Sequence, residues 1–327
     1  MLRPGRVAYV LSGALALAAT AAAALTVSFP SLITGVDAAR GNLRGTALVV
    51  LVLGVPVLVA AMSLTARGSA RALVVWLGTL GYLAYQAVLF CFATPLNNLF
   101  LIYVAYLGLA VWSVVLLLPA IDLRGFGARI ARQMPARYIA AVALTVAALN
   151  AAAWLAKIIP AVFSRNPASL VNSSGLLTNP VFVQDLAIWL PLLAAAAAAG
   201  WRRRTWGLLV TGAMLVMFVL ESIGISVDQW FGSQADPASD LASASMTPVF
   251  AVVAAVVAVP LLQYCRNIDR QPREGSSQIG VFAAQVGVEG AGCRRDPAAE
   301  PSSDVMLQKL PRPAVHRGLL GVPISVA

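Results

Sequence analysis

Residues 206–226 read WGLLVTGAMLVMFVLESIGIS, and Glu221 is the single charged side chain in this run. A helix rises about 1.5 Å per residue, so about 20 apolar residues cross a hydrocarbon core of about 30 Å. Seven other runs of this kind occur in the chain, which predicts an all-α, polytopic transmembrane helix bundle of about eight spans. The predicted spans cover residues 7–28, 46–66, 72–93, 99–120, 138–159, 183–200, 206–226 and 246–264.

The composition of the chain agrees with a membrane location. Of the 327 residues, 60% are hydrophobic and 11% are charged, whereas a soluble domain carries about 25% charged residues. The formal net charge of +10 would suggest nucleic acid in a soluble protein. Here the basic residues form short clusters between apolar runs, and no recognition motif accompanies them. We therefore expect a lipid bilayer with anionic headgroups as the partner, and no nucleic acid.

The basic residues also predict the orientation of the chain. With the N-terminus in the cytoplasm, connections on that side hold eleven arginines before the last span, against four basic residues on the outer side. This excess predicts a multi-pass protein of the cell (plasma) membrane, a bacterial inner membrane, with both ends cytoplasmic. The cytoplasmic set is Arg3, Arg6, Arg67, Arg71, Arg124, Arg129, Arg132, Arg137, Arg202, Arg203 and Arg204, and the outer set is Arg40, Arg44, Lys157 and Arg165. Contact with the lipid headgroups is expected for Arg124, Arg129, Arg132, Arg202, Arg203 and Arg204.

The two ends of the chain differ in kind. The first run follows Arg3 and Arg6, as in a secretory signal peptide, but its apolar stretch reaches Phe29 and is longer than a usual signal core. We therefore expect a retained anchor within a bundle of residues 1–264. Residues 265–327 are rich in Pro, Gly, Ser and charge, which predicts a disordered cytoplasmic tail.

An internal repeat is suggested by two prolines. Pro56 and Pro191 lie 135 residues apart, and each precedes a basic turn by eleven residues. The same offset maps Gln86 onto Glu221. The pattern predicts two parallel four-helix halves, as in transporters with parallel repeats. Chance similarity between apolar helices is the alternative.

Ionisable groups inside spans are costly, and they are the first candidates for a functional site. Lys157, Asp185 and Glu221 are expected at a similar depth in the outer half of the bundle, where Lys157 can pair with either carboxylate. The polar neighbours expected on that side are Gln86, Tyr85, Asn97 and Asn98. These side chains either line a small polar pocket or clamp helices together without a ligand. The outer loop, predicted over residues 227–245, holds Asp228, Asp236 and Asp240, which we expect to be solvated.

Catalytic and metal-binding motifs do not occur in the sequence. It contains no HExxH, GxSxG or Walker A motif. The three cysteines, Cys91, Cys265 and Cys293, lack metal-ligand spacing, and the single histidine, His316, lies in the predicted tail. We therefore expect no cofactor, no metal site and no catalytic residue, and an enzyme is the least favoured class.

Several stretches resemble a group of uncharacterised bacterial, actinobacterial-type multi-pass membrane proteins. They are GYLAYQ (residues 81–86), PLNNLFLIYVA (95–105), NPVFVQDL (179–186), ESIG (221–224) and DQWFG (228–232). The resemblance covers roughly residues 45–264. It implies a fold and a membrane location, and no assigned activity. It also draws attention to Gln86, Asp185 and Glu221.

Three function classes follow from these observations. The leading prediction is an integral membrane protein of unknown activity, acting as a structural or regulatory subunit with unknown protein partners. A small-solute or ion transporter with a polar site in the outer half is the alternative, and a membrane-embedded enzyme comes third. The transporter and enzyme classes are favoured over the subunit if Lys157, Asp185 and Glu221 point into one solvent-connected cavity.

Overall fold

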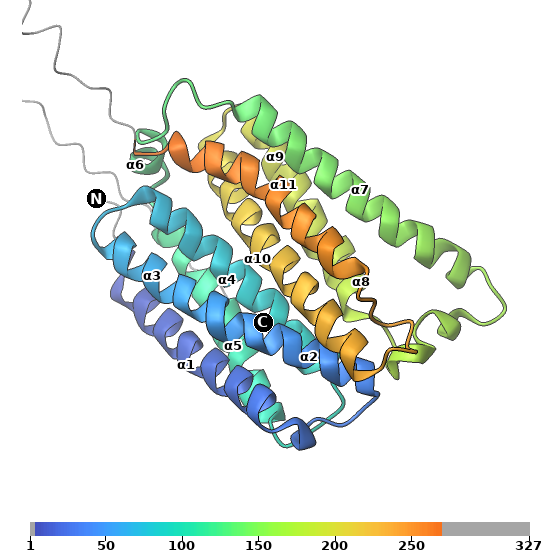
Figure 1. The fold of residues 1–327 in the computed structure, drawn as a ribbon. Coiled ribbons are helices and arrows are strands. Elements are labelled where there is room, and N and C mark those ends of the chain that lie inside the picture. Colours follow the sequence, from blue (N-terminus) through green and yellow to red (C-terminus); the bar gives the residue numbers. More distant parts are fainter. Residues whose placement is uncertain (1–3, 270–327) are drawn as a thin grey trace, which may run out of the picture. The chain divides into compact units, whose positions relative to one another are not determined.

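The computed structural model of the protein describes residues 4–269, drawn as the coloured ribbon in Figure 1. Over this range it contains no β-strand and eight helices that are long and apolar enough to cross a membrane. The predicted all-α bundle of eight spans is confirmed, and it identifies a multi-pass membrane protein. The spans are α1 (Arg6–Ser28), α2 with η2 and α3 (Asp37–Val49, Val50–Gly54, Val55–Ala66), α4 (Ala70–Phe92), α5 with η3 (Phe100–Leu117, Leu118–Ala120), α7 (Ala136–Val162), α8 with η6 and α9 (Pro180–Gln184, Asp185–Trp189, Leu190–Trp201), α10 (Thr205–Ala235) and α11 (Met246–Arg266).

Two spans extend much further than the sequence predicts. The second begins at Asp37 instead of residue 46, and the seventh ends at Ala235 instead of residue 226. The added segments pack closely on each other, because a Cβ atom on Gly45 would lie 2.6 Å from the Cα atom of Asp228. The start of α2 and the end of α10 therefore cover each other's polar residues, which the sequence predicts to lie in loops.

This packing corrects three placements. Arg40 and Arg44, expected in an outer loop, lie on α2. Asp228, expected as a solvated loop residue, lies on α10 and is half-buried. Asp236 and Asp240 remain in the connection after α10, as predicted.

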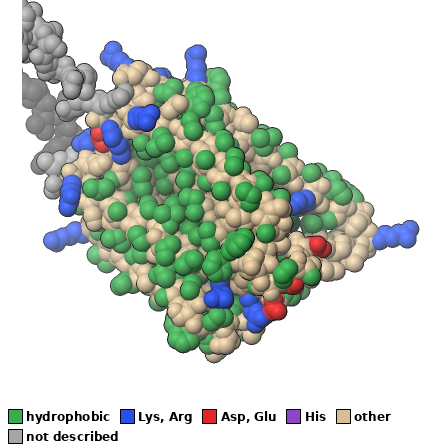
Figure 2. All heavy atoms as spheres, viewed as in Figure 1, with side chains coloured by type: hydrophobic (Ala, Val, Ile, Leu, Met, Phe, Trp, Pro, Cys, Tyr) green, Lys and Arg blue, Asp and Glu red, His purple; other side chains and the backbone are tan. Residues whose placement is uncertain are grey.

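The two central spans are α4 and α10. In the most apolar stretch of each helix, 83% of the α4 residues and 72% of the α10 residues are buried, against at most 39% in the other six spans. The two helices cross at Gly78, where an added Cβ atom would lie 2.6 Å from the Cβ atom of Val216. Apolar side chains cover the middle of the face shown in Figure 2, as expected for a surface in contact with lipid.

Backbone features of the first half recur 135 residues later in the second half. The second and sixth spans each contain one π-helical turn, η2 and η6, at residues 50–54 and 185–189. The following basic turns also match. The backbone N–H of Gly68 donates to Thr65 O at 2.8 Å, and that of Arg203 donates to Gly200 O at 2.8 Å. Both Gly68 and Arg203 have positive φ, at 92° and 55°. These matches support the predicted arrangement of two parallel four-helix halves.

The halves differ in how their outer helices pack. In the first half α1 packs along α5, whereas in the second half α7 and α11 touch at few positions. Figure 1 shows α1 and α7 at opposite edges of the bundle, with α4 and α10 between them. The second half is therefore the more open of the two.

The turns at residues 67–69, 122–135 and 202–204 lie at one end of the bundle, called the basic end below. An even number of spans returns the chain to this end after α11. There the Asp269 carboxylate accepts hydrogen bonds from Ala70 N at 3.1 Å and from Arg129 Nη1 at 3.2 Å. Arg71 Nε donates to Ile268 O at 2.9 Å. Residues 267–269 thus hydrogen-bond to the bundle.

Several sequence predictions lie outside the described residues. They are residues 270–327 of the tail predicted over 265–327, with Cys293 and His316, and the N-terminal Arg3.

Candidate functional site

The centre of the candidate site is a hydrogen bond between the two central spans. Gln86 Nε2 on α4 donates to Glu221 Oε2 on α10 at 2.5 Å, and both side chains are buried. Each residue lies sixteen positions beyond the start of its helix, about 24 Å from the basic end. Equivalent positions of the two halves therefore contact each other. In the predicted arrangement of two parallel halves, such a contact lies on the axis that relates them.

Buried polar atoms without a partner lie near this pair. Among residues 4–269, no hydrogen bond reaches Gln86 Oε1 or the hydroxyl oxygens of Tyr82 and Tyr106. A Cβ atom on Gly224, one turn beyond Glu221, would lie 3.6 Å from the Tyr82 hydroxyl and 3.9 Å from Gln86 Nε2. The Tyr82 hydroxyl thus lies beside the pair. A buried polar atom left unpaired costs about 1–3 kcal/mol, so a ligand that pairs with these atoms would gain that energy.

The two π-helical turns flank the same part of α4. A Cβ atom on Gly54, the last residue of η2, would lie 2.9 Å from the Tyr82 ring. On the other side, the Trp189 ring of η6 lies 6.2 Å from the Tyr85 ring, centroid to centroid. π-Helical turns disturb the regular hydrogen-bond ladder and occur often at functional sites. Interrupted spans at matching positions of two repeats point to a binding site.

A second carboxylate, Asp185, is the first residue of η6. Trp154 Nε1 on α7 donates to Asp185 Oδ2 at 2.7 Å, and the Tyr85 hydroxyl lies near the same carboxylate. Lys157 is exposed, and its Nζ atom lies 5.5 Å from the centroid of the Trp154 ring. Lys157 thus makes a cation–π contact with Trp154. Lys157 forms no ion pair with Asp185 or Glu221.

No ion pair within residues 4–269 involves a carboxylate of this cluster. The two ion pairs in that range join Arg40 to Asp37 and Arg129 to Asp269, both at helix ends. Glu221 is therefore held by a neutral amide alone. A charged side chain in the bilayer interior is expensive when it has no counter-charge.

The remaining predicted site residues lie in the turn between α4 and α5. Asn97 Oδ1 accepts from Leu99 N at 2.9 Å, and Asn97 Nδ2 donates to Pro95 O at 3.1 Å. Asn98 is exposed. Over the described range neither asparagine hydrogen-bonds to Glu221 or Asp185, and Asn97 shapes the turn.

The structure adds Asp228, which the sequence predicts in a loop. It lies two turns beyond Glu221 on α10, near the Thr46 side chain on α2. The spacing of seven between Glu221 and Asp228 is the signal that could have identified it, since residues seven apart share a helix face.

The six arginines expected at the headgroups lie at the basic end and are exposed. Two of them also bond the backbone. Arg129 Nη1 donates to Gly68 O at 2.6 Å, and Arg203 Nη2 donates to Met134 O at 2.6 Å. Their contact with lipid stays a prediction.

Comparison of the chain with protein-family models, curated proteins and solved structures gave no match. The resemblance to actinobacterial-type membrane proteins therefore stays a prediction as well.

Proposed function

We propose that this protein is a small-solute or ion transporter, and that a coupling cation, either a proton or a monovalent metal ion, binds at the Gln86–Glu221 pair. The observation that carries the proposal is the position of Glu221. It is buried on the axis between the two halves, beside the matching π-helical turns, and it lacks a cationic partner among the described residues.

The chemistry of the pair favours a singly charged ion. An ionised carboxylate at this depth costs several kcal/mol unless a proton or a cation neutralises it. The unpaired oxygens of Gln86, Tyr82 and Tyr106 are neutral, hard ligands of the kind that hard cations prefer. No group of three or more His, Cys, Asp or Glu among residues 4–269 is placed to hold a metal ion. One carboxylate among neutral oxygens matches one positive charge.

A structural or regulatory membrane subunit is the second candidate. The observation that favours it is the Gln86–Glu221 hydrogen bond itself, which joins the two halves. Interhelical polar contacts in membranes are worth about 0.6–2 kcal/mol and fix packing without any ligand. The two candidates differ in whether Glu221 responds to ions.

Location and orientation belong to the same proposal. The excess of arginine at the basic end supports a plasma-membrane protein with this end in the cytoplasm. Glu221 then lies in the half of the bundle nearer the outside.

Infrared difference spectroscopy on the protein in liposomes tests the site. Buffers are exchanged between acid and alkaline pH, and between sodium, potassium and choline chloride. We expect a carboxyl band that responds to one of these exchanges, that Glu221→Gln removes and that Asp240→Asn keeps. Asp240 is the matched control because it is an exposed carboxylate in the connection before α11.

The outcomes separate the candidates. A band that responds to pH alone identifies a proton site, and one that responds to sodium or potassium identifies a metal-ion site. Identical spectra of the wild type and Glu221→Gln under every exchange would overturn the transporter proposal. If Glu221→Gln then lowers only thermal stability, the pair is a clamp.

A further inference from the structure

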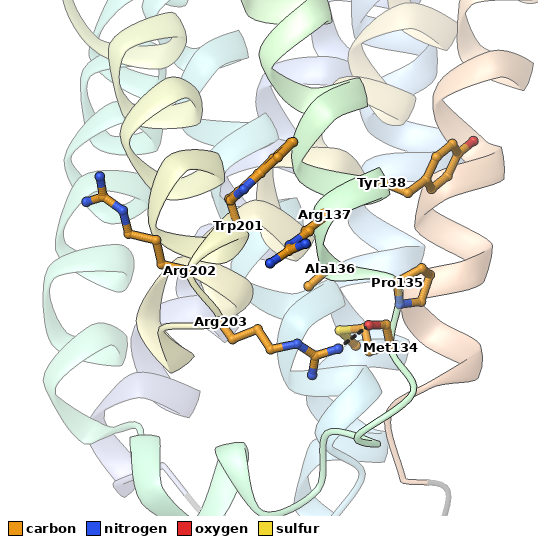
Figure 3. Close-up of a pocket in the computed structure, with 8 residues that line it drawn as sticks. All are labelled: Met134, Pro135, Ala136, Arg137, Tyr138, Trp201, Arg202 and Arg203. Carbon is orange, nitrogen blue, oxygen red and sulfur yellow. Dashed lines mark hydrogen bonds between the residues drawn. The ribbon is translucent and has the colours of Figure 1, made fainter.

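A hollow of about 550 Å³ opens at the basic end of the second half. It lies between the first turn of α7 and the turn that joins α9 to α10. Figure 3 shows the eight residues that line it, which include three arginines and no acidic residue. The hollow is separate from the Gln86–Glu221 pair, because each of those residues lies about 24 Å along its helix from the basic end.

The charges in this hollow are largely free to bind. Arg203 uses one nitrogen to donate to Met134 O at 2.6 Å, the dashed line in Figure 3. Within the described part of the chain, no hydrogen bond or ion pair engages the guanidinium groups of Arg137 and Arg202. In Figure 3 the Arg202 side chain points away from the other two, so Arg137 and Arg203 form the centre of the site.

The start of α7 adds backbone donors. This helix has 27 residues, and Pro135 at its N-cap supplies no side-chain hydrogen bond to its first turn. Backbone N–H groups at an uncapped helix start attract anions, and here two guanidinium groups accompany them. Arginine binds phosphate oxygens with its planar fork, so the site suits a phosphate group.

The surroundings favour a phosphate that belongs to lipid. Tyr138 and Trp201, both 44% exposed, border the hollow. Exposed aromatic rings of this kind are typical of the headgroup level of a bilayer. Two of the three spans that start or end at the hollow, α7 and the α8–α9 span, are only 22% and 33% buried over their most apolar stretches. Their apolar outer faces can receive acyl chains next to the headgroup.

We propose that this hollow binds the phosphate group of an anionic membrane phospholipid. The site belongs to the second half alone, because the position equivalent to Arg203 is Gly68. Arg67, the counterpart of Arg202, lies at the same end of the bundle but outside the hollow.

Native mass spectrometry of the full chain, titrated with phosphatidylglycerol or phosphatidylcholine, tests the proposal. We expect the wild type to prefer phosphatidylglycerol. Arg137→Gln should weaken its binding about tenfold, because a charge-assisted hydrogen bond is lost. Arg203→Gln should weaken it similarly, while Arg67→Gln, which removes the same charge from the same end, should bind as the wild type does. Since Arg137 is exposed and its side chain bonds no group within residues 4–269, Arg137→Gln should fold normally.

Three results would overturn the proposal. The first is equal retention of phosphatidylglycerol by Arg137→Gln and the wild type. The second is an equal loss in Arg67→Gln, which would indicate a diffuse effect of charge. The third is displacement of the lipid by inorganic phosphate or glycerol 3-phosphate at matching concentration, which would identify a site for free phosphate. Glu221→Gln should leave lipid binding unchanged, so this result is independent of the transporter proposal.

Discussion

The two halves of the molecule share a backbone and differ in chemistry. At the position of Glu221 the first half has Gln86, and at the position of Asp185 it has Val50. The position of Asp228 corresponds to Ala93. The π-helical turns, in contrast, occur in both halves at matching residues. The shared backbone therefore supplies the interruptions of the spans, while the carboxylates that give the site its charge come from the second half.

Packing shows the same division. The half that contributes no carboxylate to the site is closed by the contact of α1 with α5, and the half that contributes them leaves α7 and α11 largely exposed. Helices with few buried contacts unfold locally at lower cost. The first half thus supports the site, and the second half holds its charged groups.

The largest expected effect comes from breaking the crossing of the two central helices. Gly78→Ala places a Cβ atom 2.6 Å from the Cβ atom of Val216, closer than side-chain atoms approach. We expect this change to lower the free energy of unfolding by about 3 kcal/mol. Thermal unfolding in detergent measures the loss. Gly108→Ala is the control, since its Cβ atom would meet nothing within 4 Å. Equal stability of the two variants would show that the halves do not depend on this crossing.

Exchanging the residues on the axis sharpens the comparison of the halves. Gln86→Glu alone places two carboxyl groups in contact and should lower stability by about 2 kcal/mol, because neither has a counter-charge. The double variant Gln86→Glu, Glu221→Gln restores one amide and one carboxyl group. It should recover most of the stability in the same thermal assay. A double variant no more stable than Gln86→Glu would mean that the surroundings of the two positions are not equivalent.

A smaller effect is expected at the second carboxylate, which the first half lacks. Trp154→Phe removes the N–H group that donates to Asp185 at 2.7 Å and should lower stability by about 1–2 kcal/mol. Trp112→Phe on α5 is the matched control in the first half, because Trp112 is 59% exposed. Chemical unfolding in mixed micelles compares the two. If Trp112→Phe lowers the free energy of unfolding as much as Trp154→Phe does, the hydrogen bond to Asp185 is not the cause of the loss.

The smallest effect concerns the turn of the first half at the basic end. Arg129→Gln removes an exposed ion pair to Asp269 and a bond to Gly68 O, and it should cost about 0.5–1 kcal/mol. The rate of backbone amide hydrogen exchange should rise in residues 67–71. It should stay constant in residues 202–206, since the turn at 202–204 is held by the hydrogen bond of Arg203 to Met134. A rise in both turns would show that the basic end unfolds as one unit.

The sequence predicted the spans well because length and hydropathy decide membrane insertion almost alone. It misplaced the start of α2 and the end of α10, because Gly41 and Gly45 let the two helices cover each other's polar residues. The π-helical turns could not be read from the sequence, although Pro56 and Pro191 follow each of them closely.

For the candidate site, the offset of 135 in the sequence relates Gln86 to Glu221, and the structure joins the two by a hydrogen bond. The partner of Asp185 was not predictable, because depth in the membrane does not fix which way a side chain faces. Lys157 and Trp154 lie three residues apart on α7, and Trp154 is the one that donates to the carboxylate. Asp228 was missed because the predicted helix ended too early.

The contact of Gln86 with Glu221 has a consequence for how such a molecule arises. In a homodimer of one four-helix half, the residue on the axis would meet its own copy, as two amides or as two carboxyl groups. An amide paired with a carboxyl group on the axis requires that the two equivalent positions be encoded separately, one as Gln and one as Glu. A duplicated and fused gene allows this, and a gene for a single half does not.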